Sequence, residues 1–501
     1  QDLKKNDIKV IFKMNKSKKI LFLIIFLSLI FSIFISKYNL NNYDLNVSVD
    51  GRTYHKMIKT DPYRYLSHGY EIKNQLKKGY NFFQTGRENY TKYLPSRLAA
   101  LYYYVFDIEF SEEKNEIKDS QNLSVKEGNH YLYLYIQCLI YFSTLVFLTI
   151  NLSKILNKKI LIFIIFFLAL EPTIFQYHGT FWSESIFFSL QILIIGIILK
   201  KYKRHYDYLM IGFFVGLLSL QKQLAIFYII PLIIYFYYFE REKFFRSISL
   251  ILITFFCVQS FLGINNFYRS GKFYIMTADT KVEMHRNMVV KVMSKKLNIT
   301  TDEFKELEGE IVHEWIKKNN FEINYNTKSL KNGSGFMAFR NSVVNEADRV
   351  IVDKFIRKRT LEIIYQNPSD FFKHAFKSAI HVPLLNPFHI YSEHNFVSSE
   401  IYYTSQKHDD LILPRIIYSI FIYFFALIGF VMLLKTREYK FNFFLLISFL
   451  YFYATIFWHG NTRYYLPCLI YISFFFGVGF HYILSMIIKN YKFDKIFEIK
   501  K

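Results

Sequence analysis

The chain has 501 residues, of which 52% are apolar and 20% aromatic, and its formal net charge is +23. The apolar residues form unbroken blocks that lack the polar face of a soluble helix or strand, which excludes an ordinary soluble domain. The basic residues gather between these blocks and form no stripe on a soluble domain, which argues against nucleic-acid binding. A helix needs about 20 mostly apolar residues to cross the hydrocarbon core of a bilayer. We therefore predict an all-α, multi-pass membrane protein.

The apolar blocks predict about ten membrane-spanning helices. Their predicted bounds are Ile20–Ile35, Tyr131–Ile150, Ile160–Phe175, Ser185–Leu199, Tyr206–Leu220, Leu224–Phe239, Ser247–Ile264, Leu411–Leu434, Phe441–Trp458 and Tyr464–Ile488. The three cysteines, Cys138, Cys257 and Cys468, all fall inside these spans, which argues against a disulfide framework.

The chain begins with a predicted cytoplasmic segment, residues 1–19, in which Met14 is a candidate start and residues 1–13 an upstream extension. The first apolar run, Ile20–Ile35, has the length of a signal peptide core, but no small-residue cleavage site follows it. We therefore interpret this run as a membrane anchor.

The first long polar segment, residues 36–130, contains the first candidate catalytic groups. Asp50 and Asp61 each precede a predicted helix and have a tyrosine four residues further on. An aspartate in that position is either a helix N-cap or, near the membrane surface, a candidate general base. Arg52 and Glu88, in the same segment, are candidate substrate-binding residues.

A second feature of this segment is the apolar stretch Leu98–Phe106, which we predict to be an amphipathic helix in the membrane interface. The segment interrupts the predicted catalytic core, residues 20–264, between its first and second spans.

Short polar connections within this core hold further candidates. His178 and Glu184 precede the fourth span, where a carboxylate either complements a helix N-terminus or faces a cavity or partner. Lys222 lies in a tight polar turn after the fifth span, on the face where short loops are poor in lysine. This position makes Lys222 a candidate ligand for an anion.

The second long polar segment, residues 265–410, is predicted to fold outside the membrane. A Thr-Thr-Asp-Glu sequence precedes Phe304, and apolar residues follow at helical spacing, which predicts an N-capped amphipathic helix. Another helix is predicted over Val350–Tyr365, and the Asn-Pro pair at 367–368 ends it.

The C-terminal region, residues 411–488, holds the last three predicted spans, and residues 489–501 form a cytoplasmic tail. Arg463 and Tyr464 lie at the connection that leads into the last span, as candidate substrate-binding residues. An arginine there either reaches the interface with its long side chain or binds phosphate with its planar fork of donors.

The distribution of basic residues predicts the orientation. With ten spans, the basic clusters of the N-terminus, the short loops and the tail all fall on one side of the membrane. The positive-inside rule assigns that side to the cytoplasm, so both termini are predicted cytoplasmic and both long segments non-cytoplasmic. The predicted location is a bacterial inner membrane.

Cations and carboxylates are thus predicted to converge on the non-cytoplasmic face. Lys222 and Arg463 would neutralise a leaving phosphate, and an aspartate would take the proton of an acceptor hydroxyl. The histidines show no spacing typical of metal ligands, and no nucleotide-binding or hydrolase motif occurs.

The order of these features resembles the GT-C superfamily of glycosyltransferases that use polyprenyl-phosphate sugars, in its protein mannosyltransferase-like and aminoarabinose-transferase-like branch. The matching stretches are the first-loop Asp-x3-Tyr, Tyr93–Leu98, Glu171–Ser185, Gly212–Lys222, Asn265–Phe273 and Arg463–Pro467. Each stretch is loose, and their order carries the resemblance over most of the chain.

The resemblance implies a GT-C-like bundle and an inverting transfer of a hexosyl or pentosyl group to a glycan, lipid or protein acceptor, with or without a divalent metal ion. Asp50, or failing that Asp61, would be the base, and Arg52 would assist at the phosphate. The family's first loop often has two adjacent acidic residues, whereas here Gly51 follows Asp50 and Pro62 follows Asp61. The base and the metal therefore stay open.

Other functions are compatible with a multi-pass chain. A transporter or flippase of lipid-linked saccharides would show charges at mid-span and inverted repeats, and the predicted spans are nearly free of charge. A polysaccharide polymerase or ligase is the enzymatic alternative, and a membrane scaffold the non-catalytic one.

Overall fold

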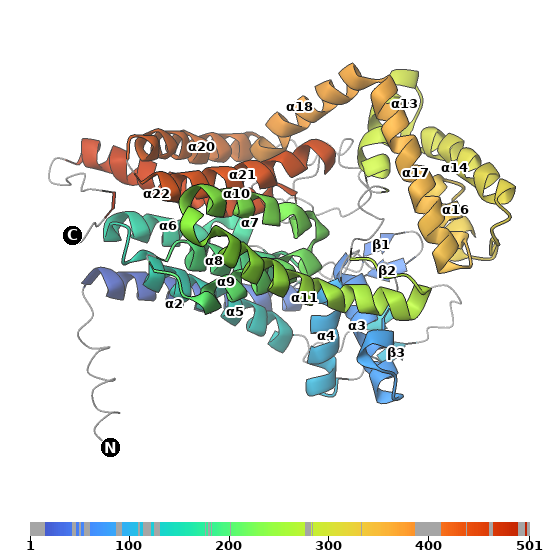
Figure 1. Cartoon of the computed structure of the whole chain (residues 1–501), viewed down its shortest axis with the longest axis horizontal. Helices are drawn as coiled ribbons and strands as arrows, with labels where there is room; N and C mark the ends of the chain where they lie inside the picture. The colour runs from blue at the N-terminus through green and yellow to red at the C-terminus, as the bar shows by residue number, and fades with distance from the viewer. Residues whose placement is uncertain are drawn as a thin grey trace.

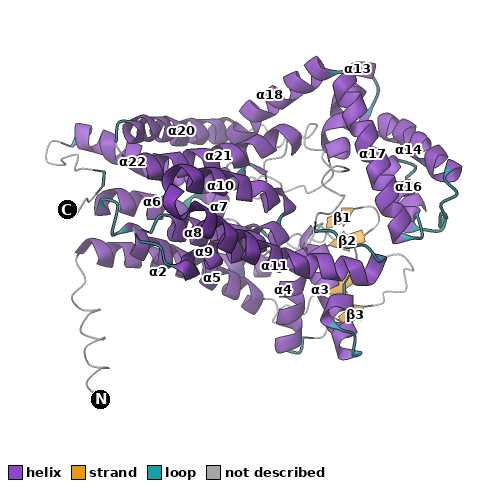
Figure 2. Ribbon diagram, in the orientation of Figure 1, coloured by secondary structure: helices purple, strands orange, loops and turns teal. Residues whose placement is uncertain are grey.

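The computed structural model describes residues 16–42, 47–49, 52–54, 61–86, 93–108, 111–113, 122–124, 131–175, 177–178, 181, 183–200, 202–275, 282, 284–331, 333–385, 412–436, 438–459, 464–488 and 496–497. These residues are almost all helical, with two small two-stranded sheets (Figure 2). The prediction of an all-α membrane protein is confirmed.

Long helices packed side by side form a bundle (Figure 1). Its elements are α2 (Lys16–Asn42), α5 (Tyr131–Leu152), α6 (Lys158–Leu170), α7 (Pro172–Phe175), α8 (Glu184–Ile198), α9 (His205–Gln221), η4 (Gln223–Tyr228), α10 (Ile229–Phe239), η5 (Arg241–Lys243), α11 (Phe244–Ser270), α20 (Ile412–Leu434), α21 (Tyr439–His459) and α22 (Leu466–Ile487). Each of the ten predicted spans coincides with one of these helices or with two consecutive ones.

Five helices among the described residues are long and apolar enough to cross a membrane: Leu132–Leu152, Arg241–Arg269, Ile416–Leu434, Tyr439–Phe457 and Leu466–Ile487. Lys19–Phe34, Glu184–Ile198 and Gln223–Phe239 are apolar but shorter. The third predicted span is broken at Glu171 because Pro172, which has no backbone N–H, starts a new short helix there. The number of membrane spans, ten, therefore stays a prediction.

Small residues bring two helices of the bundle into backbone contact. A Cβ atom on Gly429 of α20 would lie 1.8 Å from the carbonyl oxygen of Phe475, and one on Gly479 of α22 would lie 1.9 Å from that of Phe425. Helices in lipid gain little from the hydrophobic effect and associate through such close packing.

The first long polar segment, residues 36–130, is predicted to be non-cytoplasmic and is named the first external segment. Its elements are β1 (Val47–Val49), β2 (Arg52–Tyr54), α3 (Asp61–Lys77), η2 (Phe82–Gln84), α4 (Tyr93–Val105), β3 (Ser111–Glu113) and β4 (Asn122–Ser124). The helix predicted after Asp50 is wrong. Arg52 to Tyr54 form a strand that pairs with β1, and Val49 opposes Arg52. Only Asp-Gly separates these two paired residues, a dipeptide that favours a tight hairpin.

The predicted helix over Leu98–Phe106 corresponds to α4, which starts five residues earlier and ends at Val105. Its outer face carries exposed apolar side chains, among them Leu101 and Tyr104. That face is consistent with a position in the membrane interface.

The second long polar segment, residues 265–410, is likewise named the second external segment. It has its own core and lies beyond the bundle, at the upper right of Figure 1. Its elements are η6 (His285–Val289), α13 (Val290–Leu297), α14 (Thr301–Lys318), α15 (Lys328–Lys331), α16 (Phe336–Ser342), α17 (Glu346–Gln366) and α18 (Pro368–Leu385). The two helices predicted here are confirmed. Thr300 caps α14 in a reciprocal pair of bonds with Glu303, and Asn367 is the C-cap of α17.

Segments predicted to be cytoplasmic meet at the opposite end of the bundle. Leu156, in the turn after α5, pairs with Phe497 near the C-terminus. Lys203, after α8, forms an ion pair of 2.7 Å with Glu240, after α10. The described parts of the basic loops therefore share one end, as the topology requires.

Candidate active site

A buried ion pair lies where two helices of the bundle meet. Glu184 is the first residue of α8, and Lys222 is the C-cap of α9. The Lys222 ammonium nitrogen lies 2.8 Å from a Glu184 carboxylate oxygen, and the two side chains are 12% and 0% exposed. The ammonium also lies 5.4 Å from the centre of the Phe187 ring. Such a pair persists only with good geometry, because removing both charges from water costs several kcal/mol for each ion.

A chain of hydrogen bonds connects this pair to the first external segment. The Gln221 side-chain nitrogen donates to the Ser183 carbonyl at 2.8 Å, and the Ser183 hydroxyl lies 3.4 Å from Glu184. The Tyr65 hydroxyl lies 3.4 Å from the Ser183 hydroxyl. Tyr65 belongs to the first turns of α3, so the beginning of this helix lies against the ion pair.

This contact matters for the candidate bases. Asp61 is the first residue of α3 and precedes Tyr65 by four residues, which is about one turn of helix. Asp50 lies outside the described residues. Of the two candidates, Asp61 is therefore the one whose helix is seen to reach the ion pair.

The other predicted residues are distributed as follows. Arg52 is the first residue of β2, and Glu88 and Arg463 lie outside the described residues. Tyr464 lies two residues before α22, and its carbonyl accepts a hydrogen bond of 3.3 Å from the Thr455 hydroxyl of α21. The structure thus joins Glu184 to Lys222, whereas the predicted convergence of Arg463 and Asp50 with them stays a prediction.

The helix that follows Arg463 does pack against the helix that begins at Glu184. The Gln191 amide of α8 lies 3.4 Å from the Pro467 carbonyl of α22. In the predicted topology both helices run inward from the non-cytoplasmic face. Residues that precede Pro467 and Gln191 therefore lead toward the same end of the bundle.

His178 is fully buried beside this region. Its Nδ1 lies 2.9 Å from the Ser185 hydroxyl, and its ring packs at 3.9 Å from the centre of the Tyr141 ring. Burial lowers the pKa of the His178 imidazole to about 3, so the ring is neutral at physiological pH. Its Nε2 has no hydrogen-bond partner among the described residues. The predicted role of His178 in lining a substrate pocket is untested.

Sequence reasoning did not select three polar residues that the structure places at the ion pair: Tyr65, Ser183 and Gln221. Ser183 and Gln221 directly precede Glu184 and Lys222 in the chain, so adjacency to a predicted site residue could have indicated them. Tyr65 lies over a hundred residues away in sequence from Ser183, so only the tertiary structure joins them.

Glu171, at the end of α6, is another buried carboxylate that was not selected. It accepts a hydrogen bond of 2.7 Å from the Ile174 backbone and one of 2.8 Å from the Thr173 hydroxyl. These contacts make Glu171 the cap of the short helix α7.

A metal site needs several His, Cys, Asp or Glu side chains close together, and the structure describes the side chains of part of the chain. In that part of the chain, no group of three or more His, Cys, Asp or Glu residues could hold a metal ion. Asp50, Glu88 and the Asp61 side chain lie outside that part, so the possible divalent metal ion stays a prediction.

The chain matches no protein-family model and no curated protein. Its fold is similar to two structures of oligosaccharyltransferase from Archaeoglobus fulgidus. One is AglB in complex with an inhibitory peptide and a dolichol-phosphate, with 14% identity, a TM-score of 0.44 and coverage of 94% of this chain and 52% of that one. The other is an apo form, with 13% identity, a TM-score of 0.46 and coverage of 97% and 53%. The chain thus spans about half the length of these proteins.

Proposed function

We propose that this protein is a membrane glycosyltransferase of the hexosyl- or pentosyl-transferring kind. It moves a sugar from a polyprenyl-phosphate donor to a glycan, lipid or protein acceptor at the non-cytoplasmic face. The observation that carries the proposal is the buried Glu184–Lys222 pair, joined through Ser183 to the beginning of α3.

The location of this pair favours a functional role over a purely structural one. Ionisable groups inside a membrane bundle are costly and mark substrate or ion pathways. Lys222 and Glu184 sit at the mouth of α8 and α9, where a lipid-linked donor would present its phosphate. A lysine ammonium has three donors, so a bond to Glu184 is compatible with a bond to a phosphate oxygen.

The proposed reaction is a single displacement. The acceptor hydroxyl oxygen forms a bond to the anomeric carbon while the bond from that carbon to the phosphate oxygen breaks. A first-segment aspartate, Asp61 or Asp50, takes the hydroxyl proton, and polyprenyl phosphate leaves. Lys222 neutralises the charge that grows on the phosphate, assisted in this proposal by Arg463 and Arg52.

Glu184 has a different task in this scheme. Its buried carboxylate fixes the position of the Lys222 ammonium, so that little reorganisation is needed when charge develops on the phosphate. Gln221 in turn holds the backbone at Ser183, and the Ser183 hydroxyl donates to the Glu184 carboxylate.

The test is transfer of radiolabelled sugar from polyprenyl-phosphate donors in membranes that contain the protein. We expect Lys222→Gln to abolish transfer, and either Asp61→Asn or Asp50→Asn to do the same at normal protein levels. The matched control is Lys200→Gln, because Lys200 forms a similar pair of 2.6 Å with the buried Asp207 at the opposite end of the bundle.

Two results would count against the proposal. Equal transfer by wild type and Lys222→Gln would remove Lys222 from the reaction. An absence of transfer from any donor, together with movement of lipid-linked saccharide across vesicles, would favour the transporter.

A further inference from the structure

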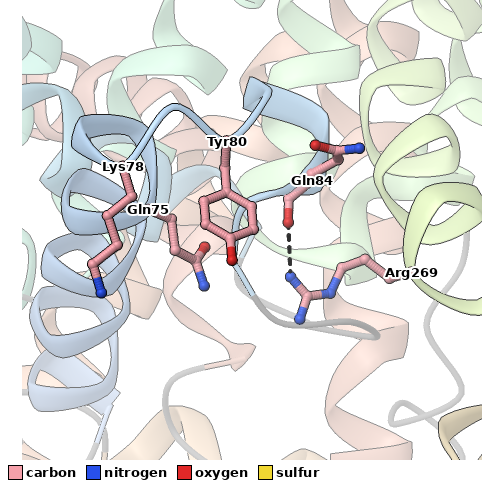
Figure 3. Close-up of a pocket in the computed structure, with 5 residues that line it drawn as sticks. All are labelled: Gln75, Lys78, Tyr80, Gln84 and Arg269. Atoms are coloured by element: carbon pink, nitrogen blue, oxygen red, sulfur yellow. Dashed lines mark hydrogen bonds between the residues drawn. The ribbon is translucent and has the colours of Figure 1, made fainter.

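A second polar site lies outside the proposed active site, between the ends of α3 and α11. It is a cavity of about 410 Å³ lined by Gln75, Lys78, Tyr80, Gln84 and Arg269. In the view of Figure 3, the Gln75 amide and the Tyr80 hydroxyl lie between the Lys78 ammonium and the Arg269 guanidinium. The five lining residues thus include two cations, three neutral polar groups and no carboxylate.

This cavity is separate from the Glu184–Lys222 pair. Along α3, Tyr65 at the ion pair and Gln75 at the cavity are ten residues apart, which is about 15 Å of helix. Along α11, Gln259 donates at 2.9 Å to the Gly216 carbonyl of α9, and Arg269 lies ten residues further on. The cavity therefore lies closer to the outer end of the molecule than Lys222 does.

The walls of the cavity are fixed by hydrogen bonds. Gly86 donates its backbone N–H to the Gln75 side chain at 2.7 Å, and Arg97 donates to the Thr85 carbonyl at 2.7 Å. From α11, Asn265 donates to the Phe83 carbonyl at 2.6 Å, and Arg269 Nη1 donates to the Gln84 carbonyl at 3.1 Å (Figure 3). The loop between α3 and α4 is thereby held against α11 in one geometry.

The described residues that line the cavity carry a net positive charge. Both helices end here, and a helix C-terminus carries roughly half a negative charge. Two such ends offset about one of the two positive charges of Lys78 and Arg269. Arg97, close behind Arg269, makes its contacts with carbonyl and hydroxyl oxygens and with the rings of Phe82 and Tyr93, so its charge adds to the positive field.

We propose that this cavity binds a phosphate-bearing group at the non-cytoplasmic face. Arginine and lysine together are suited to phosphate, the first by its fork of donors and the second as a point charge. The tyrosine hydroxyl and the amides supply neutral donors for the remaining oxygens. The volume also holds more than a phosphate alone, since pockets for small organic ligands begin at about 300 Å³.

The phosphate can come from two sources. Helix α11 has 27 residues and is therefore about 40 Å long, whereas the hydrocarbon core is about 30 Å thick. Its outer end, with Arg269, can thus stand at the level of the lipid head groups or beyond. An anionic lipid head group and a soluble sugar phosphate share the chemistry that the cavity recognises.

The test uses the full-length protein in nanodiscs of zwitterionic phosphatidylcholine. One arm titrates glucose 1-phosphate by calorimetry, and the other measures retention of phosphatidic acid, mixed into the discs, by native mass spectrometry. We expect at least one probe to bind and Lys78→Gln to weaken it by about tenfold, the usual size of a charge-assisted hydrogen bond. Arg269→Gln should weaken it at least as much, with the thermal transition confirming that the variant is folded.

Lys77→Gln is the matched control. Lys77 neighbours Lys78 in sequence, but its ammonium lies 2.6 Å from Asp107, and it does not line the cavity. Binding of the soluble probe alone would assign the site to a soluble ligand, and binding of the lipid alone would assign it to the bilayer. Binding of neither probe, or an equal loss in Lys77→Gln and Lys78→Gln, would overturn the proposal.

Discussion

The membrane bundle and the second external segment use buried charge in different ways. In the bundle, the large core is apolar and aromatic, and the Glu184–Lys222 pair lies at a helix mouth. In the external segment, buried ion pairs lie inside a small core: Arg340 with Asp353, and Arg359 with Glu308. We therefore interpret the buried ion pairs of the two regions differently.

The two regions are predicted to have different surroundings, which are lipid around the bundle and water around the external segment. In the external segment, which is predicted to fold outside the membrane, ion pairs join packed helices: Arg340 joins α16 to α17, and Arg359 joins α17 to α14. In the bundle, glycine contacts such as Gly429 with α22 bring helices together. The ion pairs Lys200–Asp207 and Lys203–Glu240 lie at its predicted cytoplasmic end. The Glu184–Lys222 pair, which lies at a helix mouth, is thus the better functional candidate.

The largest effect is expected at the bundle pair. Lys222→Met leaves Glu184 buried without its partner, which costs about 3–5 kcal/mol of stability. We also expect the rate of sugar transfer to fall by at least about a hundredfold, since each 1.36 kcal/mol of lost transition-state stabilisation is tenfold in rate. Thermal unfolding in detergent and the transfer assay measure the two effects separately.

Exchanging the charges of Glu184 and Lys222 distinguishes a structural role of the pair from a functional one. The double variant Glu184→Lys with Lys222→Glu keeps a pair at the same place, so stability should largely return. Transfer should stay lost, because a carboxylate would then face the phosphate. Recovery of transfer in this variant would show that the pair only holds the helices together.

In the external segment the corresponding change should affect stability but not chemistry. Arg340→Met leaves Asp353, whose side chain is fully buried, without its two hydrogen bonds of 2.7 and 2.9 Å. We expect a loss of about 3–5 kcal/mol, seen as faster proteolysis of the external segment. Replacing both residues, with Asp353→Leu added, should recover most of it. No recovery would mean that the pair also has a role in binding.

Acid should weaken the external segment through Glu308. Burial alone would raise the pKa of this carboxyl, but hydrogen bonds from Arg359 and the His285 ring nitrogen 3.4 Å away outweigh it and lower the pKa from 4.5 to about 2. A folded pKa below the unfolded one means that the stabilisation is present above pH 4.5 and is lost as the pH falls toward 2. At 1.36 kcal/mol per unit this is about 3 kcal/mol.

The measurement is the thermal transition of the external segment against pH. Glu308→Gln should be less stable at neutral pH and should show a flatter dependence between pH 4.5 and 2. A profile as steep as that of the wild type would assign the acid sensitivity to other carboxyls.

The smallest effect is expected from a single methyl group in the bundle. Gly479→Ala places a Cβ atom against the Phe425 carbonyl and should separate α20 from α22, at a cost of about 1–3 kcal/mol. The control is Gly333→Ala, where a Cβ atom would meet nothing within 4 Å. Equal transition temperatures for the two variants would show that the helices can move apart without cost.

Much of the fold could be predicted from local sequence. The bounds of α5, α8 and α9 lie within two residues of the predicted spans, because an apolar run must be helical in lipid to satisfy its own backbone. The cap at Thr300 was likewise readable, since an N-cap depends on neighbours three residues away. The helix after Asp50 failed because the hairpin signal of Asp-Gly outweighs the capping tendency of aspartate.

By itself, then, the sequence determined where most of the helices form, and it predicted which single residues could carry chemistry. The tertiary structure alone decided which side chains meet: Lys222 with Glu184, Tyr65 with Ser183, and Lys78 with Arg269 around one cavity. Spans and caps depend on a few consecutive residues, whereas these contacts join positions that are 38 or more residues apart. Their geometry depends on how the helices pack, which no short stretch of the chain encodes.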